Sequence, residues 1–211
     1  MRISKEEHFV CAECLNGKFE EAFKTQKKST SGTILPEGII LQHALWNFDK
    51  GGYLQELLHQ LKYHRLTGVG IDIGRQLGKS LLQNTHFMEA INNNKVRLLP
   101  VPLHPNKRRM RGYNQAFFIA KGVAEVTQLP ISKRGIVVRN RNTNTQTGFS
   151  MEKRRKNMEG AFSVAKPEKI KDSICVIIDD VFTTGATTFE LSNELKKTGC
   201  TNIMIATVAQ A

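Results

Sequence analysis

Residues 175–187 of the chain read CVIIDDVFTTGAT. The apolar, mostly β-branched run over 174–178 is typical of a strand that is buried on both faces of a parallel sheet. A turn over 179–185 is expected next, then a helix that ends near Lys197, with Gly199 beyond it as a C-terminal cap. The apolar run over 202–208 predicts a second buried strand. A strand, a helix and a strand in this order predict a doubly wound, mainly parallel α/β sheet.

The remaining sequence divides the chain into two parts. Residues 1–33 contain a close pair of cysteines and then a polar run rich in Lys, Ser and Thr, which is typical of a linker. From residue 34 onward the pattern is that of one α/β domain, 34–211. In that domain we expect strands over 39–48 and 97–101, helices over 54–61, 70–83 and 114–127, and short strands near 135–138 and 160–164.

The net charge of the 211-residue chain is +12, and it is unevenly distributed. Residues 95–171 contain 18 Lys and Arg against 4 Asp and Glu, whereas the rest of the chain is slightly acidic. Such a concentration favours polyanionic partners: phosphates, nucleic acid or an acidic surface. No apolar run approaches the roughly 18 residues that a membrane span needs, and the N-terminus lacks the apolar core of an export signal. We therefore expect a cytoplasmic protein without membrane insertion.

Asp179 and Asp180 follow the first buried strand, and ligands of open α/β sheets bind outside the carboxyl ends of the strands. Two adjacent carboxylates can accept hydrogen bonds from a vicinal diol, such as the 2- and 3-hydroxyls of ribose. The next residues offer hydroxyls and backbone N–H groups at a helix N-terminus, which suits a monophosphate; they are Thr183, Thr184, Gly185, Ala186 and Thr187. The pattern predicts a ribose 5-phosphate site. The alternative is an ordinary strand–turn–helix in which Asp180 or Thr184 serves only as a cap.

Over residues 175–187 the chain resembles the motif by which type I phosphoribosyltransferases bind 5-phosphoribosyl-1-pyrophosphate (PRPP). Three further segments resemble the ComF family, which is linked to DNA uptake (competence) in bacteria. They are 100–105 with 111–115, the T-x-T-Q…R-x-x-N…F spacing over 143–162, and Leu61-Lys-Tyr63. The resemblance implies the type I phosphoribosyltransferase fold for 34–211 and binding of PRPP with Mg²⁺.

The resemblance also assigns roles in the basic middle of the chain. A pyrophosphate loop over 102–111 would include Pro102, Leu103, His104, Lys107 and Arg111. A flexible hood over 139–157 would close on the substrate, with Arg154 as a clamp beside the acidic pair Asp179 and Asp180, and with Thr145, Gln146 and Asn157 in its motif. Mg²⁺ would be bound by pyrophosphate and ribose oxygens.

The cysteine pair Cys11 and Cys14 has the spacing of half a structural zinc site, and His8 is a conceivable third ligand. ComF proteins usually carry two such pairs, so either the first pair has been lost or the chain begins downstream of the true start. A partial zinc-ribbon-like appendage is therefore expected, and a complete Zn²⁺ site is the less favoured interpretation. Cys175 and Cys200 are expected to be core thiols.

Two functions remain open on the sequence. The first is a phosphoribosyltransferase, or a sensor that binds PRPP without transfer. The second is a non-catalytic competence accessory that binds single-stranded DNA, and other competence proteins would then be partners. In the second case Tyr113 and Phe149 are the aromatic residues freest to stack on a base, whereas Phe117 and Phe118 are expected in the core.

Overall fold

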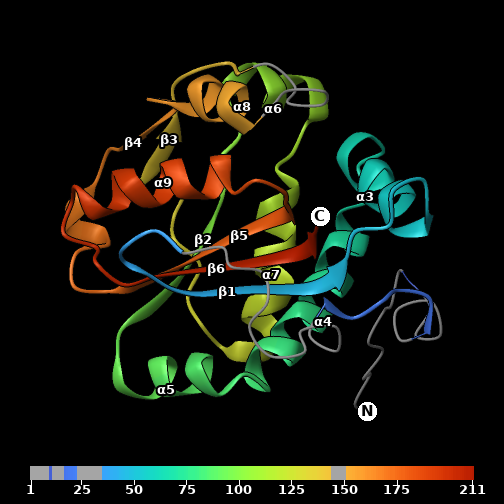
Figure 1. The fold of residues 1–211 in the computed structure, drawn as a ribbon, viewed down its shortest axis with the longest axis horizontal. Coiled ribbons are helices and arrows are strands. Elements are labelled where there is room, and N and C mark those ends of the chain that lie inside the picture. The colour runs from blue at the N-terminus through green and yellow to red at the C-terminus, as the bar shows by residue number, and fades with distance from the viewer. Residues whose placement is uncertain (1–9, 11–16, 23–34, 144–150) are drawn as a thin grey trace, which may run out of the picture.

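Four parallel strands form the centre of the computed structural model, which describes residues 10, 17–22, 35–143 and 151–211 (Figure 1). Their order across the sheet is β1 (Ile39–Asn47), β6 (Ile203–Gln210), β5 (Ile174–Phe182) and β2 (Val96–Pro100). Every neighbouring pair in this sheet is parallel, as the sequence predicts for buried β-branched strands.

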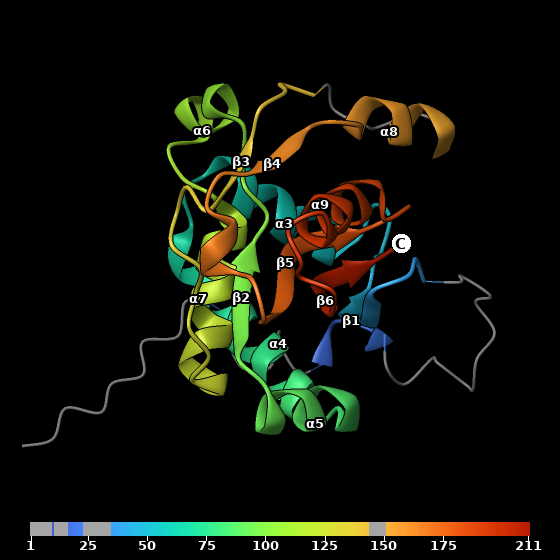
Figure 2. The ribbon, with the colours of Figure 1, turned by 90° about the vertical axis from the view of Figure 1, so that its left-hand side faces the viewer.

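Helices cover both faces of this sheet (Figures 1 and 2). On one face, α4 (Thr67–Leu82) and α7 (Gln115–Thr127) pack against side chains that include Leu98, Val176 and Ile178. On the other face, α9 (Ala186–Lys196) packs with the small antiparallel sheet of β3 (Val137–Arg139) and β4 (Phe162–Val164). The predicted doubly wound α/β fold is therefore confirmed.

The remaining helices lie around this core. They are α3 (Tyr53–Tyr63), α5 (Thr85–Asn93), α6 (Pro105–Arg111), α8 (Met151–Met158) and the 3-10 helix η1 (Pro167–Lys169). Within the described ranges, none of the helices is long and apolar enough to cross a membrane.

The structure corrects several sequence-based boundaries. β5 continues to Phe182, so Asp179 and Asp180 lie in the last part of the strand and not in a turn. The expected loop over 102–111 contains α6, and the expected hood loop over 139–157 contains most of α8. Neither helix has a regular apolar face, because both are largely basic, and their sequences therefore show no helical period.

Two aromatic assignments were also wrong. Phe117, in the first turn of α7, is 42% exposed and therefore does not lie in the core. Tyr113 is only 8% exposed and packs edge-on against Phe118, so it is not available to stack on a base. Phe149 lies outside the described residues. Cys175 and Cys200 are free, buried thiols, as predicted.

Candidate functional site

The carboxyl ends of β2 and β5 lie side by side in the sheet. After β2 the chain passes to α7 on one face, and after β5 it passes to α9 on the other face, so the two connections diverge. Such a divergence creates a crevice at the strand ends, where α/β proteins bind their ligands. The structure therefore places the predicted motif at the position in this sheet that is best suited to a ligand.

The loop that follows β2 is fixed to this edge by backbone and side-chain hydrogen bonds. The N–H of Val101 donates to the carbonyl of Ile178 at 2.9 Å. The side-chain amide of Asn114 donates to the carbonyl of Val101 at 2.9 Å, and its oxygen accepts from the N–H of Ala116 at 3.1 Å. Asn114 is thus the N-cap of α7, and it also holds the start of the loop in place.

The acidic pair has one strong partner, Lys62 of α3. The Lys62 ammonium lies 2.6 Å from Oδ2 of Asp180, whose side chain is 9% exposed. The N–H of Asp180 donates to Oδ1 of Asp179 at 2.9 Å. Sequence reasoning found Lys62 only as part of the Leu61–Tyr63 motif and gave it no role, since its partner is far away in the chain.

These contacts separate the acidities of the two carboxyl groups. Burial, and then the neighbouring Asp180 carboxylate, raise the pKa of Asp179 well above its usual range. Burial alone would also raise the pKa of Asp180, but the attraction of the Lys62 ammonium, a hydrogen bond with Asp179 and the attraction of Arg111 together hold that pKa below the usual value. Asp180 is therefore the member of the pair that carries the charge, and Asp179 resists ionisation. A carboxylate beside a protonated carboxyl group can form hydrogen bonds with two neighbouring hydroxyls.

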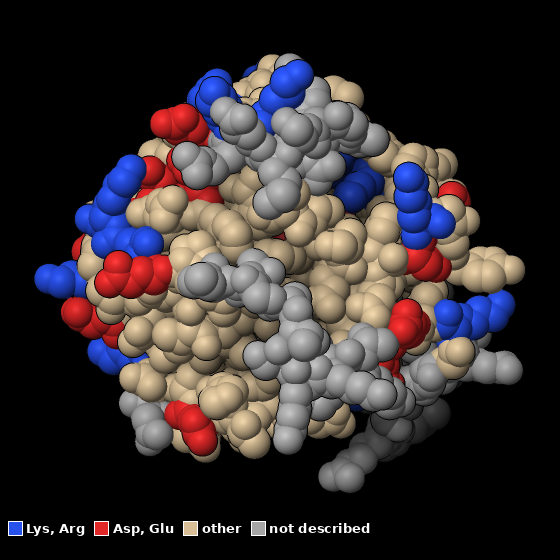
Figure 3. Space-filling view, viewed as in Figure 1, with Lys and Arg blue, Asp and Glu red and all other residues tan. Residues whose placement is uncertain are grey.

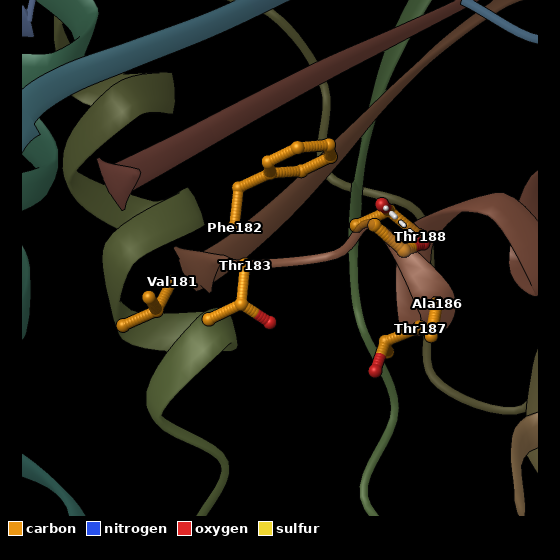
Figure 4. Close-up of a pocket in the computed structure, with 7 residues that line it drawn as sticks. Val181, Phe182, Thr183, Ala186, Thr187 and Thr188 are labelled. Carbon is orange, nitrogen blue, oxygen red and sulfur yellow. Dashed lines mark hydrogen bonds between the residues drawn. The ribbon is translucent and has the colours of Figure 1, made fainter. Parts of the chain in front are cut away.

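The turn after β5 leads directly into α9. Gly185 has φ +72°, and a Cβ on it would lie 2.4 Å from the ring of Phe189. A shallow pocket lies here, lined by residues 181–183 and 185–188, and Figure 4 shows Thr183 and Thr187 on opposite sides of it. The hydroxyl of Thr184 is buried and has no hydrogen-bond partner among the described residues. Backbone N–H groups at this helix N-terminus suit an anion.

Three basic side chains approach the same edge from α6 and β3. Arg111 donates from Nη1 to Oε1 of Gln115 at 3.1 Å and lies 5.2 Å from the centre of the Tyr63 ring. Burial, followed by repulsion from Arg139 and Arg111, lowers the pKa of Lys107. Burial also lowers the pKa of Arg139, against an opposing attraction from Asp179. Partly buried cations that repel one another favour the binding of an anion between them.

The other predicted site residues have more varied positions. Pro102, Leu103 and His104 lie between β2 and α6, and Nδ1 of His104 accepts from the N–H of Asn106 at 3.2 Å, so this histidine caps α6. Asn157 and the backbone of Arg154 belong to α8, and the Arg154 side chain is not described. Thr145, Gln146, Cys11, Cys14 and His8 lie outside the described residues. In the described part of the chain, no group of three His, Cys, Asp or Glu could hold a metal ion.

Figure 3 shows where Lys and Arg side chains lie on one face of the molecule. Lys and Arg side chains occur at the top, where Figure 1 places α6 and α8, and also at the left, beside acidic side chains.

The comparisons with known proteins agree with the sequence motifs. No protein-family model matches the chain. It is 36% identical to Competence protein F of Haemophilus influenzae over 115 residues, which are 54% of the chain and 50% of that protein. It is 29% identical to DNA utilization protein YhgH of Escherichia coli over 153 residues, 72% of the chain and 65% of that protein. The chain thus spans between half and two thirds of the length of these relatives.

A solved hypoxanthine-guanine phosphoribosyltransferase from Schistosoma mansoni, in complex with IMP, aligns with 68% of the chain and 66% of its own length, with a TM-score of 0.35 and 14% identity. The chain is thus similar in sequence to Competence protein F and YhgH, and it has the parallel α/β sheet that the phosphoribosyltransferase resemblance predicts.

Proposed function

We propose that this chain binds PRPP, or another compound of ribose 5-phosphate, at the carboxyl ends of β2 and β5. The observation that carries the proposal is the acidic pair Asp179 and Asp180 directly before a Thr- and Gly-rich helix N-terminus. The ribose hydroxyls would meet the two carboxyl groups, and the 5-phosphate would meet the N–H groups and hydroxyls at the start of α9.

The basic residues supply the other half of the proposal. The pyrophosphate of PRPP would bind among Lys107, Arg111 and Arg139, whose positive charges repel one another without an anion. Mg²⁺ would be held by oxygens of PRPP itself, because the described residues contain no cluster of protein ligands. When bound, it would neutralise part of the pyrophosphate charge.

Phosphoribosyl transfer at this site would break the bond between C1 of the ribose and the pyrophosphate oxygen. The electron pair leaves with pyrophosphate, and the acceptor forms the new bond to C1 and releases its proton to solvent. The three basic residues would stabilise the departing charge, and the acidic pair would hold the sugar in place. A PRPP sensor would use the same contacts without an acceptor. In either case we place the function in DNA uptake, following the names of the relatives.

Calorimetric titration with PRPP and Mg²⁺ tests the proposal. The native protein should bind, and the double variant Asp179→Asn/Asp180→Asn should lose most of the affinity. Asp172→Asn is the matched control, because Asp172 is exposed and its backbone, at φ +57°, is in a region that Asn tolerates. Equal affinity in the native protein and the double variant would refute the site. Release of pyrophosphate in the presence of a panel of bases then separates an enzyme from a sensor.

Single-stranded DNA is a second candidate ligand, favoured by one observation. Tyr63 is 53% exposed, and the Arg111 guanidinium lies over its ring, an arrangement that pairs a stacking surface with a phosphate-binding charge. Filter binding of a labelled oligonucleotide should then show retention that weakens steeply with salt. Absence of retention at low salt would remove this candidate.

A further inference from the structure

Lys62 is positioned by a well-anchored helix. Asp49 accepts hydrogen bonds from the N–H groups of Leu54 and Gln55, both at 3.0 Å, and so fixes the first turn of α3. Leu58 and Leu61 are fully buried and fix its last two turns against the core. The Lys62 side chain therefore extends from a helix that is fixed in place by packing, and this packing sets the direction of the side chain.

From this helix the ammonium reaches across to the end of β5. It lies 2.6 Å from Oδ2 of Asp180, and the Lys62 side chain is 28% exposed, so most of it is withdrawn from water. An ion pair in such surroundings is screened less than one on the surface. The Asp180 carboxylate is the chief cause of the raised pKa of Lys62, which keeps this side chain charged.

The contact fixes one oxygen of the Asp180 carboxylate. Lys62 engages Oδ2 of Asp180, and Oδ1 of Asp179 accepts from the Asp180 backbone. The carboxylate of Asp180 cannot turn without breaking a partly buried ion pair. Its direction is thus set before any ligand arrives, which lowers the entropy cost of binding.

We infer that Lys62 is a positioning residue of the sugar site: its ammonium fixes the Asp180 carboxylate so that the acidic pair meets the hydroxyls of a ribose in a preset direction. This inference rests on the proposed function, and it concerns the sugar half of the ligand alone. The contrary hypothesis is that Lys62 occupies Asp180 as a plug, which the ligand would have to displace.

Two probes separate the sugar contact from the general attraction of a positive charge. Ribose 5-phosphate carries the diol, whereas inorganic phosphate does not. Each is titrated into the native protein, Lys62→Gln, Lys62→Arg and Lys79→Gln. Lys79 is the matched control, because it is an exposed lysine on α4, away from this site.

The expected result is a loss of at least about tenfold in ribose 5-phosphate affinity for Lys62→Gln, the factor for one hydrogen bond to a charged group. Inorganic phosphate binding should remain nearly unchanged. Lys62→Arg should retain more of the sugar affinity than Lys62→Gln, since it keeps the charge. Lys79→Gln should match the native protein.

A double-variant cycle tests whether Lys62 acts through Asp180. Lys62→Gln should cause no further loss in a protein that already carries Asp180→Asn, because the carboxylate that it orients is gone. This comparison also holds if Lys62→Gln alone is poorly folded, since the amide of the double variant leaves no unpaired buried charge.

Each contrary outcome has a distinct meaning. Equal losses of affinity for both probes would mean that Lys62 attracts anions in general. A gain in ribose 5-phosphate affinity would mean that Lys62 blocks Asp180 as a plug. Either result overturns the inference, while the proposed site survives. If the native protein binds inorganic phosphate but shows no preference for ribose 5-phosphate, the sugar site and this inference both fall.

Discussion

The ring of Phe189 covers the side of Gly185 on which any other residue would carry its Cβ. A Cβ there would lie 2.4 Å from the ring, and the backbone of Gly185 has φ +72°. The turn that leads into α9 therefore depends on glycine for two separate reasons, its backbone conformation and its lack of a side chain.

Gly185→Ala should therefore weaken ribose 5-phosphate binding by at least about tenfold, because the clash with Phe189 displaces the turn that meets the ligand. It should also lower the melting temperature, because left-handed backbone strain alone costs about 1–2 kcal/mol. Gly135→Ala is a sharp control. Gly135 has φ +85° and nothing within 4 Å of its Cβ position, so it shares the strain without the clash. Calorimetry and thermal unfolding should show reduced stability in both variants and reduced binding only in Gly185→Ala. Equal binding by the two variants would contradict this account of the turn.

Asp179 should reduce stability near neutral pH. Its pKa is raised well above the ordinary 3.8 in the folded protein, so on unfolding it releases a proton that the folded state retained. Stability therefore falls as pH rises from about 3.8 toward the folded pKa, and below 3.8 both states are protonated and the effect vanishes. Asp179→Asn should stabilise the protein at pH 7 by at least about 1 kcal/mol, because a tenfold difference in acidity between the folded and unfolded states is worth about that much.

Urea unfolding at several pH values measures this effect. The gain from Asp179→Asn should shrink as the pH is lowered toward 3.8. A gain that is independent of pH would mean that the carboxyl group is not the source of the difference. A more stable but non-binding variant would also identify Asp179 as a residue that is retained at a cost in stability.

The sequence predicted the fold well because its decisive signal is local. The run over 174–178 and its acidic pair can be recognised without any distant partner. Asn114, a residue type that favours helix N-caps, likewise marks the start of α7. α6 was missed because its basic residues have no apolar period; His104 at its start and the left-handed Gly112 at its end define it.

The ion pair of the candidate site was the part hidden from sequence reasoning. Lys62 and Asp180 are brought together only when α3 packs at the end of β5, and no spacing rule connects them. The sequence likewise predicts a loop that begins at Arg139, although this residue ends β3 and interacts electrostatically with the Asp179 side chain. Tertiary packing decides both contacts.

The crossing of α4 and α7 should be intolerant of side chains at its centre. A Cβ on Gly122 would lie 2.0 Å from the carbonyl oxygen of Ile71, whereas a Cβ on Gly78 would lie 3.0 Å from its nearest neighbour, on Val126. Alanine favours a helix by about 1 kcal/mol over glycine. Gly122→Ala should nevertheless be destabilised by about 3 kcal/mol or more, and Gly78→Ala should be near neutral. Chemical unfolding of the two variants checks this order, and equal stabilities would contradict the close crossing.

Arg139 should discriminate between ligands with and without pyrophosphate. Its Nε is buried and has no partner among the described residues, and burial lowers its pKa. An anion bound next to it would supply the missing hydrogen bond and relieve the repulsion from Arg111. Arg139→Gln should therefore weaken PRPP binding by about tenfold or more, the value of one hydrogen bond between charged groups. Ribose 5-phosphate, which lacks the pyrophosphate, should bind almost as it does to the native protein.

The control for this comparison is Arg134→Gln. Arg134 is exposed in the turn that precedes β3, so its loss removes the same charge from the chain without touching the crevice. Both ligands should bind to it with native affinity, and thermal unfolding should show whether Arg139→Gln remains folded. If Arg139→Gln weakened the two ligands equally, the arginine would belong to the sugar site or to the fold, and the pyrophosphate would have to bind elsewhere along α6.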